Sequence, residues 1–191
     1  MDDNITRRLE NCYTGVIYDV MSRWVMIISL LQKKRPIIPE KTLVSPVFTI
    51  NGEVDPAANS HETLLAYTNL FLAAPAGFER VSQSNDEQVA HMGELSAETL
   101  QSRGIRGAII DGSLRDVNFI LKIKFQTWCR DFTPRDIAGY WRHKPYDTVI
   151  MIGDVCVERG DYWIGNRDGL IFMPSGVIDA VVSNAGGSNE Y

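Results

Sequence analysis

The stretch that most constrains the fold runs from Gly93 to Asp116 and reads GELSAETLQSRGIRGAIIDGSLRD. Residues 95–103 are rich in good helix formers, and Gly104 follows, a residue that readily adopts the left-handed conformation just past a helix end. Residues 107–110 form a short apolar run before an Asp-Gly pair, which is typical of a buried strand leaving into a turn. The sequence therefore predicts that the start of the helix and the exit of the strand lie side by side.

This arrangement would bring Glu94 close to the adjacent Arg115 and Asp116. An arginine can hold a carboxylate with two parallel hydrogen bonds, and the free amides of Leu95 and Ser96 at a helix N-terminus attract an anion. A magnesium ion takes one or two carboxylates and fills its other positions with waters and substrate oxygens, so Asp116 is a candidate ligand. The stretch predicts a site for a small oxo-acid and a divalent cation.

The rest of the chain predicts an α+β fold, because helical patterns dominate the first two-thirds and short strands the last third. Helices are predicted at residues 5–21, with Asn4 as the cap, at 61–74 and at 117–123. Strands are predicted at residues 43–50, ending at the turn Asn51-Gly52, and at 78–83, 125–130, 147–152, 155–157, 162–165 and 170–173. We expect a single domain over residues 1–184 and a disordered tail over 185–191.

Composition excludes several classes of protein. The chain has 191 residues, 45% of them hydrophobic, which is enough for one domain with a core. A net charge of −5 argues against a nucleic-acid surface, and we interpret the cluster Lys33, Lys34 and Arg35 as a solvated helix end. The apolar run at residues 24–31 is too short to span a membrane, so we expect a soluble protein. Three widely spaced cysteines suit reduced core thiols and a cytoplasmic location.

The same stretch resembles a known family. The motifs GEL-x-A from Gly93, RG-x-x-G from Arg103, the Asp-Gly turn and Arg115-Asp116 look like those of the ribonuclease E inhibitor-like family. That family includes 4-hydroxy-4-methyl-2-oxoglutarate aldolases, also called 4-carboxy-4-hydroxy-2-oxoadipate aldolases. The resemblance extends from Thr14 to Pro174, through SPVFTI, NDEQVAHMGEL and ERGDYWIGNRDGLIFMP. Many members carry a glycine-rich run before the Gly-Glu pair, whereas residues 82–92 contain no glycine.

The resemblance implies a β/β/α swivelling-domain fold and ring-shaped trimers whose active sites lie between subunits. It implies a lyase that uses Mg²⁺ or Mn²⁺ to release pyruvate from an oxo-acid through an enolate, by retro-aldol cleavage or by decarboxylation of oxaloacetate. Arg115, Glu94 and Asp116 are then the predicted catalytic residues, with Asp116 as the direct metal ligand and Glu94 acting through water. Together with Arg115, Gly93, Leu95 and Ser96 are the predicted substrate-binding residues. We expect a homotrimer or hexamer, with some of the apolar residues among 24–31 and Trp141 facing partners.

Two alternatives remain open at this stage. The family also holds non-catalytic regulators, so the chain is alternatively a protein that binds a ribonuclease or another partner through its trimer surface, or an inactive remnant of the lyase. Taken alone, Arg115 and Asp116 would be an ordinary surface pair and Glu94 a first-turn helix acid. His91 is interpreted as structural, since no second histidine stands at metal-ligand spacing. No zinc motif, P-loop or dinucleotide fingerprint is present, and we expect no nucleic-acid or membrane partner.

Overall fold

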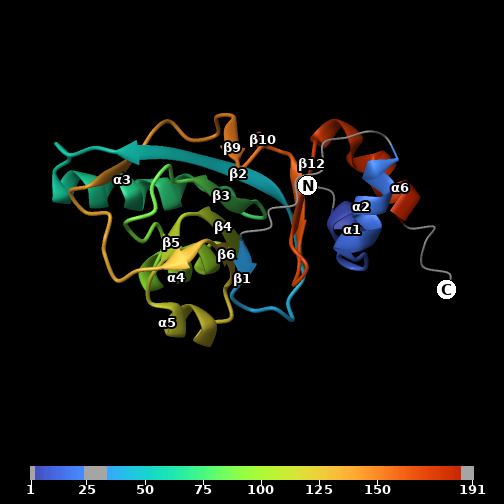
Figure 1. Cartoon of the computed structure of the whole chain (residues 1–191), viewed down its shortest axis with the longest axis horizontal. Coiled ribbons are helices and arrows are strands. Elements are labelled where there is room, and N and C mark those ends of the chain that lie inside the picture. The colour runs from blue at the N-terminus through green and yellow to red at the C-terminus, as the bar shows by residue number, and fades with distance from the viewer. Residues whose placement is uncertain (1–2, 24–33, 186–191) are drawn as a thin grey trace.

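A mixed eight-stranded sheet forms the centre of the computed structural model, which describes residues 3–23 and 34–185 (Figure 1). Its four middle strands run parallel: β6 (Gln126–Cys129), β4 (Gly107–Asp111), β3 (Glu79–Gln83) and β2 (Leu43–Val54). Antiparallel strands flank them: β1 (Arg35–Pro36) beside β6, then β11 (Tyr162–Gly165) and β12 (Leu170–Met173) beyond β2, and β8 (Trp141–His143) beside the end of β2. The carboxyl ends of the parallel strands therefore share one edge.

Two short pairs of strands complete the β structure. They are the hairpin of β9 (Ile150–Ile152) and β10 (Val155–Val157), and the parallel pair of β5 (Ser113–Leu114) and β7 (Asp131–Phe132). The second pair lies just beyond the ends of β4 and β6, so it prolongs these strands toward the segment that carries Arg115.

The two faces of the sheet bury different apolar clusters. Helices α3 (Ser60–Ala73), α4 (Glu94–Ser102) and α5 (Val117–Lys122) pack against the face that carries Ile110, whereas Ile109 joins Trp128 and Trp163 on the other face, under the β9–β10 hairpin. Neighbouring residues of a strand point to opposite faces, which is why both isoleucines are fully buried.

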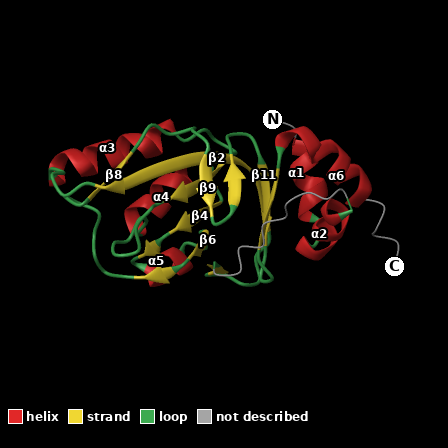
Figure 2. Ribbon diagram, turned by 45° about the horizontal axis from the view of Figure 1, so that its top comes forward, coloured by secondary structure: helices red, strands yellow, loops and turns green. Residues whose placement is uncertain are grey.

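Three further helices form a separate layer next to β12. They are α1 (Asp3–Glu10), α2 (Thr14–Ser22) and α6 (Ile178–Ala185), the last preceded by the 3-10 turn Ser175–Val177 (Figure 2). Leu9, Ile17 and Val181 from these helices are fully buried in one cluster with Ile171 of the sheet. None of the helices in the described parts of the chain is long and apolar enough to cross a membrane.

The predicted α+β class and most predicted elements are confirmed. Helix α4 begins one residue before the predicted start, and β4 covers the predicted strand and adds Asp111. Helix α3 begins after Asn59, whose side chain accepts hydrogen bonds from the amides of His61 and Glu62.

The single helix predicted for residues 5–21 is wrong. The chain turns after Leu9, whose carbonyl accepts the amide of Cys12 at 2.9 Å, and Tyr13 is extended with ψ of 151°. The apolar period continues across this break, because α1 and α2 both turn one side toward α6. Periodicity alone therefore joined two helices that share a buried face.

The predicted turn at Asn51-Gly52 is also wrong, because β2 continues through both residues to Val54 and pairs with β8. A Cβ atom at Gly52 would lie 1.9 Å from Cζ2 of Trp141, so the glycine makes room for an indole ring. Trp141, which was predicted to face a partner, is 1% exposed, and its Nε1 donates to the carbonyl of Ser84 at 2.7 Å.

Other predictions need correction at single residues. Lys34 is 3% exposed and pairs with Asp111 at 2.9 Å, so it is not part of a solvated helix end. Cys156 is exposed, whereas Cys12 and Cys129 are buried thiols as predicted. Ala185 was assigned to the disordered tail, but it is the buried last residue of α6. Residues 24–31 and the rest of the predicted tail, 186–191, lie outside the described residues. Helix α6 itself was not predicted.

Candidate active site

Gly93 stands at the centre of the candidate site, directly before the first residue of α4. Its backbone is extended, a conformation that any residue can adopt, so glycine matters here because it lacks a side chain. A Cβ atom here would lie 2.6 Å from Oδ2 of Asp116 and 2.9 Å from Cγ of Arg115. Glycine therefore allows two side chains from the other end of the stretch to approach the helix terminus.

Asp116 faces this terminus from the residue before α5. Its φ of 54° and ψ of 34° place it in the left-handed region, which aspartate tolerates better than most residues. The Oδ2 atom accepts a hydrogen bond from the amide of Glu94 at 3.1 Å. The positive end of α4 therefore stabilises the negative charge of this carboxylate.

Arg115 is fixed at both its backbone and its side chain. Its amide donates to the carbonyl of Met92 at 3.0 Å, and its Nε lies 3.4 Å from Oδ2 of Asp116. Its Nη1 donates to Oδ2 of Asp136 at 2.7 Å, while Oδ1 of Asp136 accepts the amide of Ala138 at 3.2 Å. The guanidinium thus bridges two carboxylates and keeps Nη2 without a hydrogen bond to any described residue.

A recess of about 120 Å³ opens beside these groups. Gly93, Glu94, Ser96 and Arg115 line its polar side. The other wall is apolar and consists of Leu64, Tyr67, Phe71, Met92 and Ile137. A small organic acid in this recess could therefore contact polar groups on one side and apolar side chains on the other.

The chain also matches a family model. The model is described as RraA-like, Aldolase/RraA, and it covers residues 14–172. The chain belongs to the RraA-like family. A putative 4-hydroxy-4-methyl-2-oxoglutarate aldolase from Halalkalibacterium halodurans is 24% identical over 153 residues, which are 79% of this chain and 69% of that protein. The resemblance on the Gly93–Asp116 motifs is thereby confirmed.

Solved structures show the RraA-like fold over nearly the whole chain. One, described as novel cellulases from microbes associated with the gut ecosystem, has a TM-score of 0.92 at 22% identity and covers 100% of this chain and 86% of that chain. Streptomyces coelicolor RraAS2, described as an unusual member of the RNase ES inhibitor RraA protein family, has a TM-score of 0.84 at 18% identity, over 97% and 91%. At such identities the likeness concerns the fold alone, and the fold that the resemblance implied is confirmed.

In this RraA-like chain the predicted residues come together as the sequence indicated. Glu94, Arg115 and Asp116 meet at the start of α4, and Ser96 lines the recess. Leu95 also lines the recess, although its side chain is 74% exposed. Asp116 takes the amide of Glu94, the first of the helix, so a side chain of the protein already lies beside the predicted anion cradle of Leu95, Ser96 and Arg115.

The donor set fits a divalent ion that keeps most of its waters. No group of three or more His, Cys, Asp or Glu side chains within residues 3–23 and 34–185 is arranged to enclose a metal. Asp116 nevertheless presents a half-exposed carboxylate whose orientation is fixed through Oδ2, which leaves Oδ1 for a ligand bond. One carboxylate with waters and substrate oxygens is a usual environment of Mg²⁺.

His91 is structural, as the sequence analysis interpreted it. Its side chain is 0% exposed, and its Nε2 lies 3.1 Å from Oδ2 of Asp86. Burial lowers the pKa of His91 to about 4, against the opposing effect of Asp86, so the ring is neutral at physiological pH. Its carbonyl accepts hydrogen bonds from Tyr67 and from Arg80.

Sequence reasoning missed Asp136, the closest ionic partner of Arg115. The two residues are 21 positions apart, and Asp136 lies in a loop between β7 and β8. The segment Thr133-Pro134-Arg135-Asp136 carries a turn signal but nothing that indicates which cation it meets. Its Asx-type hydrogen bond to Ala138 is a local feature of many turns and does not indicate a partner for the carboxylate.

Proposed function

We propose that this protein is a divalent-metal-dependent lyase that cleaves a carbon–carbon bond of a small oxo-acid and releases pyruvate. The observation that carries this proposal is the meeting of Asp116, Arg115 and the amide of Glu94 beside a partly apolar recess that Glu94 and Arg115 line. The named aldolase activity of one relative supports it. A retro-aldol cleavage of 4-hydroxy-4-methyl-2-oxoglutarate and the decarboxylation of oxaloacetate share the same pyruvate half.

The charges of the site explain why a cation is needed. One guanidinium, that of Arg115, stands among the carboxylates of Asp116, Asp136 and Glu94, so the site repels an anionic oxo-acid. A bound Mg²⁺ or Mn²⁺ would neutralise this excess of negative charge and would stabilise negative charge on the substrate's keto oxygen as a Lewis acid. Asp116 would hold the ion through Oδ1.

The chain's own groups divide the remaining work. Arg115 has Nε and Nη1 engaged by aspartates, so its Nη2 edge is the part that would hold the substrate carboxylate. The amides of Leu95 and Ser96 belong to the first turn of α4, where amides lack intrahelical acceptors, and they would bind a second oxygen. Glu94 would orient water and carry the proton that the reaction returns to the product.

The test is a coupled pyruvate assay with both substrates. We expect pyruvate release that requires Mg²⁺ or Mn²⁺ and disappears in Asp116→Ala, with loss of Mn²⁺ binding measured by calorimetry. Asp179→Ala, at the start of α6, is the control for removing a surface carboxylate. Activity that persists in chelator, or in Asp116→Ala, would exclude the metal role.

The alternative is a non-catalytic regulator that binds a ribonuclease. The description of RraAS2 as belonging to an inhibitor family favours it, as do the exposed side chains of Leu65 and Leu72 on α3, at 55% and 57%. Capture of a purified ribonuclease E at micromolar concentration, together with no turnover of either oxo-acid, would place this function first. Retention that is lost in Leu65→Ser would locate the surface.

The proposed lyase is a homotrimer or a dimer of trimers that works in the cytoplasm. The exposed side chains of Leu95 at the helix start and Phe132 beside Arg115, at 74% and 55%, leave apolar surface at the site that a neighbouring subunit would cover. Light scattering measures the assembly. A concentration-independent monomer near 21.5 kDa would refute a shared site.

A further inference from the structure

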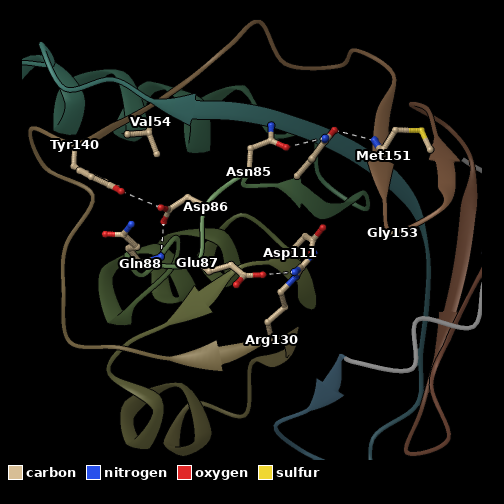
Figure 3. A pocket seen from close by; sticks show the side chains of 11 residues that line it. Val54, Asn85, Asp86, Glu87, Gln88, Asp111, Arg130, Tyr140, Met151 and Gly153 are labelled. Atoms are coloured by element: carbon tan, nitrogen blue, oxygen red, sulfur yellow. Dashed lines mark hydrogen bonds and ion pairs between the residues drawn. The ribbon is translucent and has the colours of Figure 1, made fainter.

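A pocket of about 730 Å³ lies at the carboxyl ends of the parallel strands, apart from the candidate active site (Figure 3). Gln83 ends β3, Asp111 ends β4 and Arg130 follows β6, and all three line the pocket. It shares no lining residue with the recess beside Arg115. Ligands of open α/β sheets commonly bind at this edge.

The floor of the pocket holds a buried group of charges. Asp111 is 8% exposed in its side chain, and its Oδ1 accepts both Lys34 Nζ at 2.9 Å and Arg130 Nε. Burial would raise the pKa of Asp111, but the hydrogen bonds of Arg130 and Lys34 bring it below its usual value, so the carboxylate is ionised. Two basic side chains therefore contact one carboxylate, although burial lowers the pKa of Lys34, and the floor can accept a further negative charge at Arg130.

Glu87 supplies that charge from the solvent side. Its carboxylate pairs with Nη1 of Arg130, yet its side chain is 73% exposed. Figure 3 shows Glu87 reaching across the pocket to Arg130 from the loop between β3 and α4. An ion pair this exposed contributes little to stability, so another carboxylate can replace Glu87 on Arg130 at small cost.

The other acid in the pocket is already satisfied. Oδ2 of Asp86 accepts the amides of Gln88 and Val89 and faces His91 Nε2, and its Oδ1 accepts the hydroxyl of Tyr140. Asp86 therefore has little remaining capacity for a ligand. Val54 and the Tyr140 ring line one end of the pocket and Met151 the other, with Asn85 and Asp86 between them in Figure 3.

We propose that this pocket is a second binding site, for a small monocarboxylate with a partly apolar body. The ligand's carboxylate takes the place of Glu87 on Arg130, above the Lys34–Asp111 pair. Its body lies beside the loop of Asp86, against Val54 and the Tyr140 ring. The charge of the floor after Glu87 leaves matches one carboxylate, because Lys34 and Arg130 then face Asp111 alone.

Titration with acetate tests the position of the carboxylate, and the ¹⁵N NMR signal of Arg130 Nε reports its binding. We expect acetate to shift this signal with saturation and Glu87→Gln to bind it about two- to fivefold more tightly, because the internal competitor is gone. Glu40→Gln is the matched control, since Glu40 is also 73% exposed and pairs with an exposed arginine. An Arg130 signal that acetate leaves unchanged in both wild type and Glu87→Gln would overturn the proposal.

Calorimetry with mandelate and its neutral counterpart mandelamide tests whether the pocket binds the ligand's apolar body and whether it requires the carboxylate charge. We expect mandelate to bind more tightly than acetate and mandelamide not to bind. Arg130→Lys keeps the charge beside Asp111 and should weaken mandelate binding about tenfold, since the planar fork is lost. Equal binding of mandelate and mandelamide, or unchanged affinity in Arg130→Lys with an unchanged melting temperature, would show that the pocket does not recognise a carboxylate.

Discussion

At the scale of single residues, Asp136 decides how Arg115 is presented. An arginine side chain has many rotamers, and the 2.7 Å ion pair to Asp136 selects one of them before substrate arrives. Asp136 is itself held by the amide of Ala138. The site is therefore organised by a loop that carries no group of the proposed chemistry.

Asp136→Asn should lower kcat/KM about tenfold, mainly through KM, because the charge-assisted hydrogen bond that orients Arg115 is weakened. Arg115→Lys should lower it roughly ten- to hundredfold through loss of the planar fork. If Asp136 acts through Arg115, the double variant should be no worse than Arg115→Lys alone. Additive losses measured in the pyruvate assay would show that Asp136 acts independently.

Gly93→Ala should reduce kcat/KM by about a hundredfold, because the new Cβ meets Asp116 Oδ2 at 2.6 Å and displaces it from the amide of Glu94. Gly15→Ala in α2 is the control, since a Cβ there meets nothing within 4 Å. It should leave kcat/KM unchanged and raise the free energy of unfolding by about 0.5–1 kcal/mol. Wild-type turnover in Gly93→Ala would place the reacting atoms elsewhere.

At the scale of elements, the local signals were sufficient where an element is defined by its own residues. The helix predicted over residues 61–74 and the short buried strand β4 follow from local helical and apolar patterns, and both are confirmed. The continuation of β2 through Gly52 was not predictable, because its cause is the Trp141 ring, which lies 89 positions away in the sequence. The break between α1 and α2 was hidden by an apolar period that both helices share.

The same limit applies to the candidate site. Glu94, Arg115 and Asp116 were predictable because one helix and one strand connect them. Asp136 and the Lys34–Asp111–Arg130 group depend on segments that meet only in the folded sheet. In the sequence these residues look like ordinary surface charges, and their pairing is visible only in the folded structure.

Strand β3 begins at Glu79, whose carboxylate accepts the amides of Arg106 and Gly107 while 1% exposed. Burial raises the pKa of Glu79 to about 7, so between pH 4.5 and 7 the folded state binds more protons than the unfolded state, and stability falls as pH rises. Burial lowers the pKa of His91 to about 4, so between pH 4 and 6.5 the unfolded state binds more protons, and stability rises with pH. The two slopes oppose each other.

We therefore expect a nearly flat free energy of unfolding between pH 4.5 and 6.5 in the wild type. Glu79→Gln removes one slope, and its free energy of unfolding should rise by about 2 kcal/mol over this range, on the order of the His91 contribution. Urea unfolding at a series of pH values measures both. Parallel profiles of wild type and Glu79→Gln would contradict the assignment, and Glu40→Gln, which alters an exposed carboxylate, should keep the wild-type profile.

At the scale of the whole molecule, Arg106 connects the helical layer to the sheet. Its Nη1 pairs with Glu10 of α1, its Nη2 donates to the carbonyl of Val44, and its Nε lies 3.4 Å from Glu79. One side chain thus joins α1, β2 and β3. The ion pair with Glu79 is expected to contribute most to stability, because Glu79 is buried.

Arg106→Met should lower the free energy of unfolding by about 2 kcal/mol at pH 7.5, because it leaves the Glu79 carboxylate without its cation. The loss should be smaller at pH 5.5, where Glu79 is protonated in the folded state. Arg167→Met, which removes an ion pair between side chains 68% and 73% exposed, should change it by less than about 0.5 kcal/mol. Equal losses in the two variants would mean that Arg106 is a surface residue.

The position of α6 has a consequence for biosynthesis. Helices α1 and α2 are synthesised long before α6, yet Leu9, Ile17 and Met21 are buried in one cluster with side chains of residues 164–185. Strand β2 likewise lacks its antiparallel partner until β11 has been synthesised. A nascent chain must therefore expose this apolar surface until α6 has been synthesised, and we expect the protein to depend on a holding chaperone over that interval.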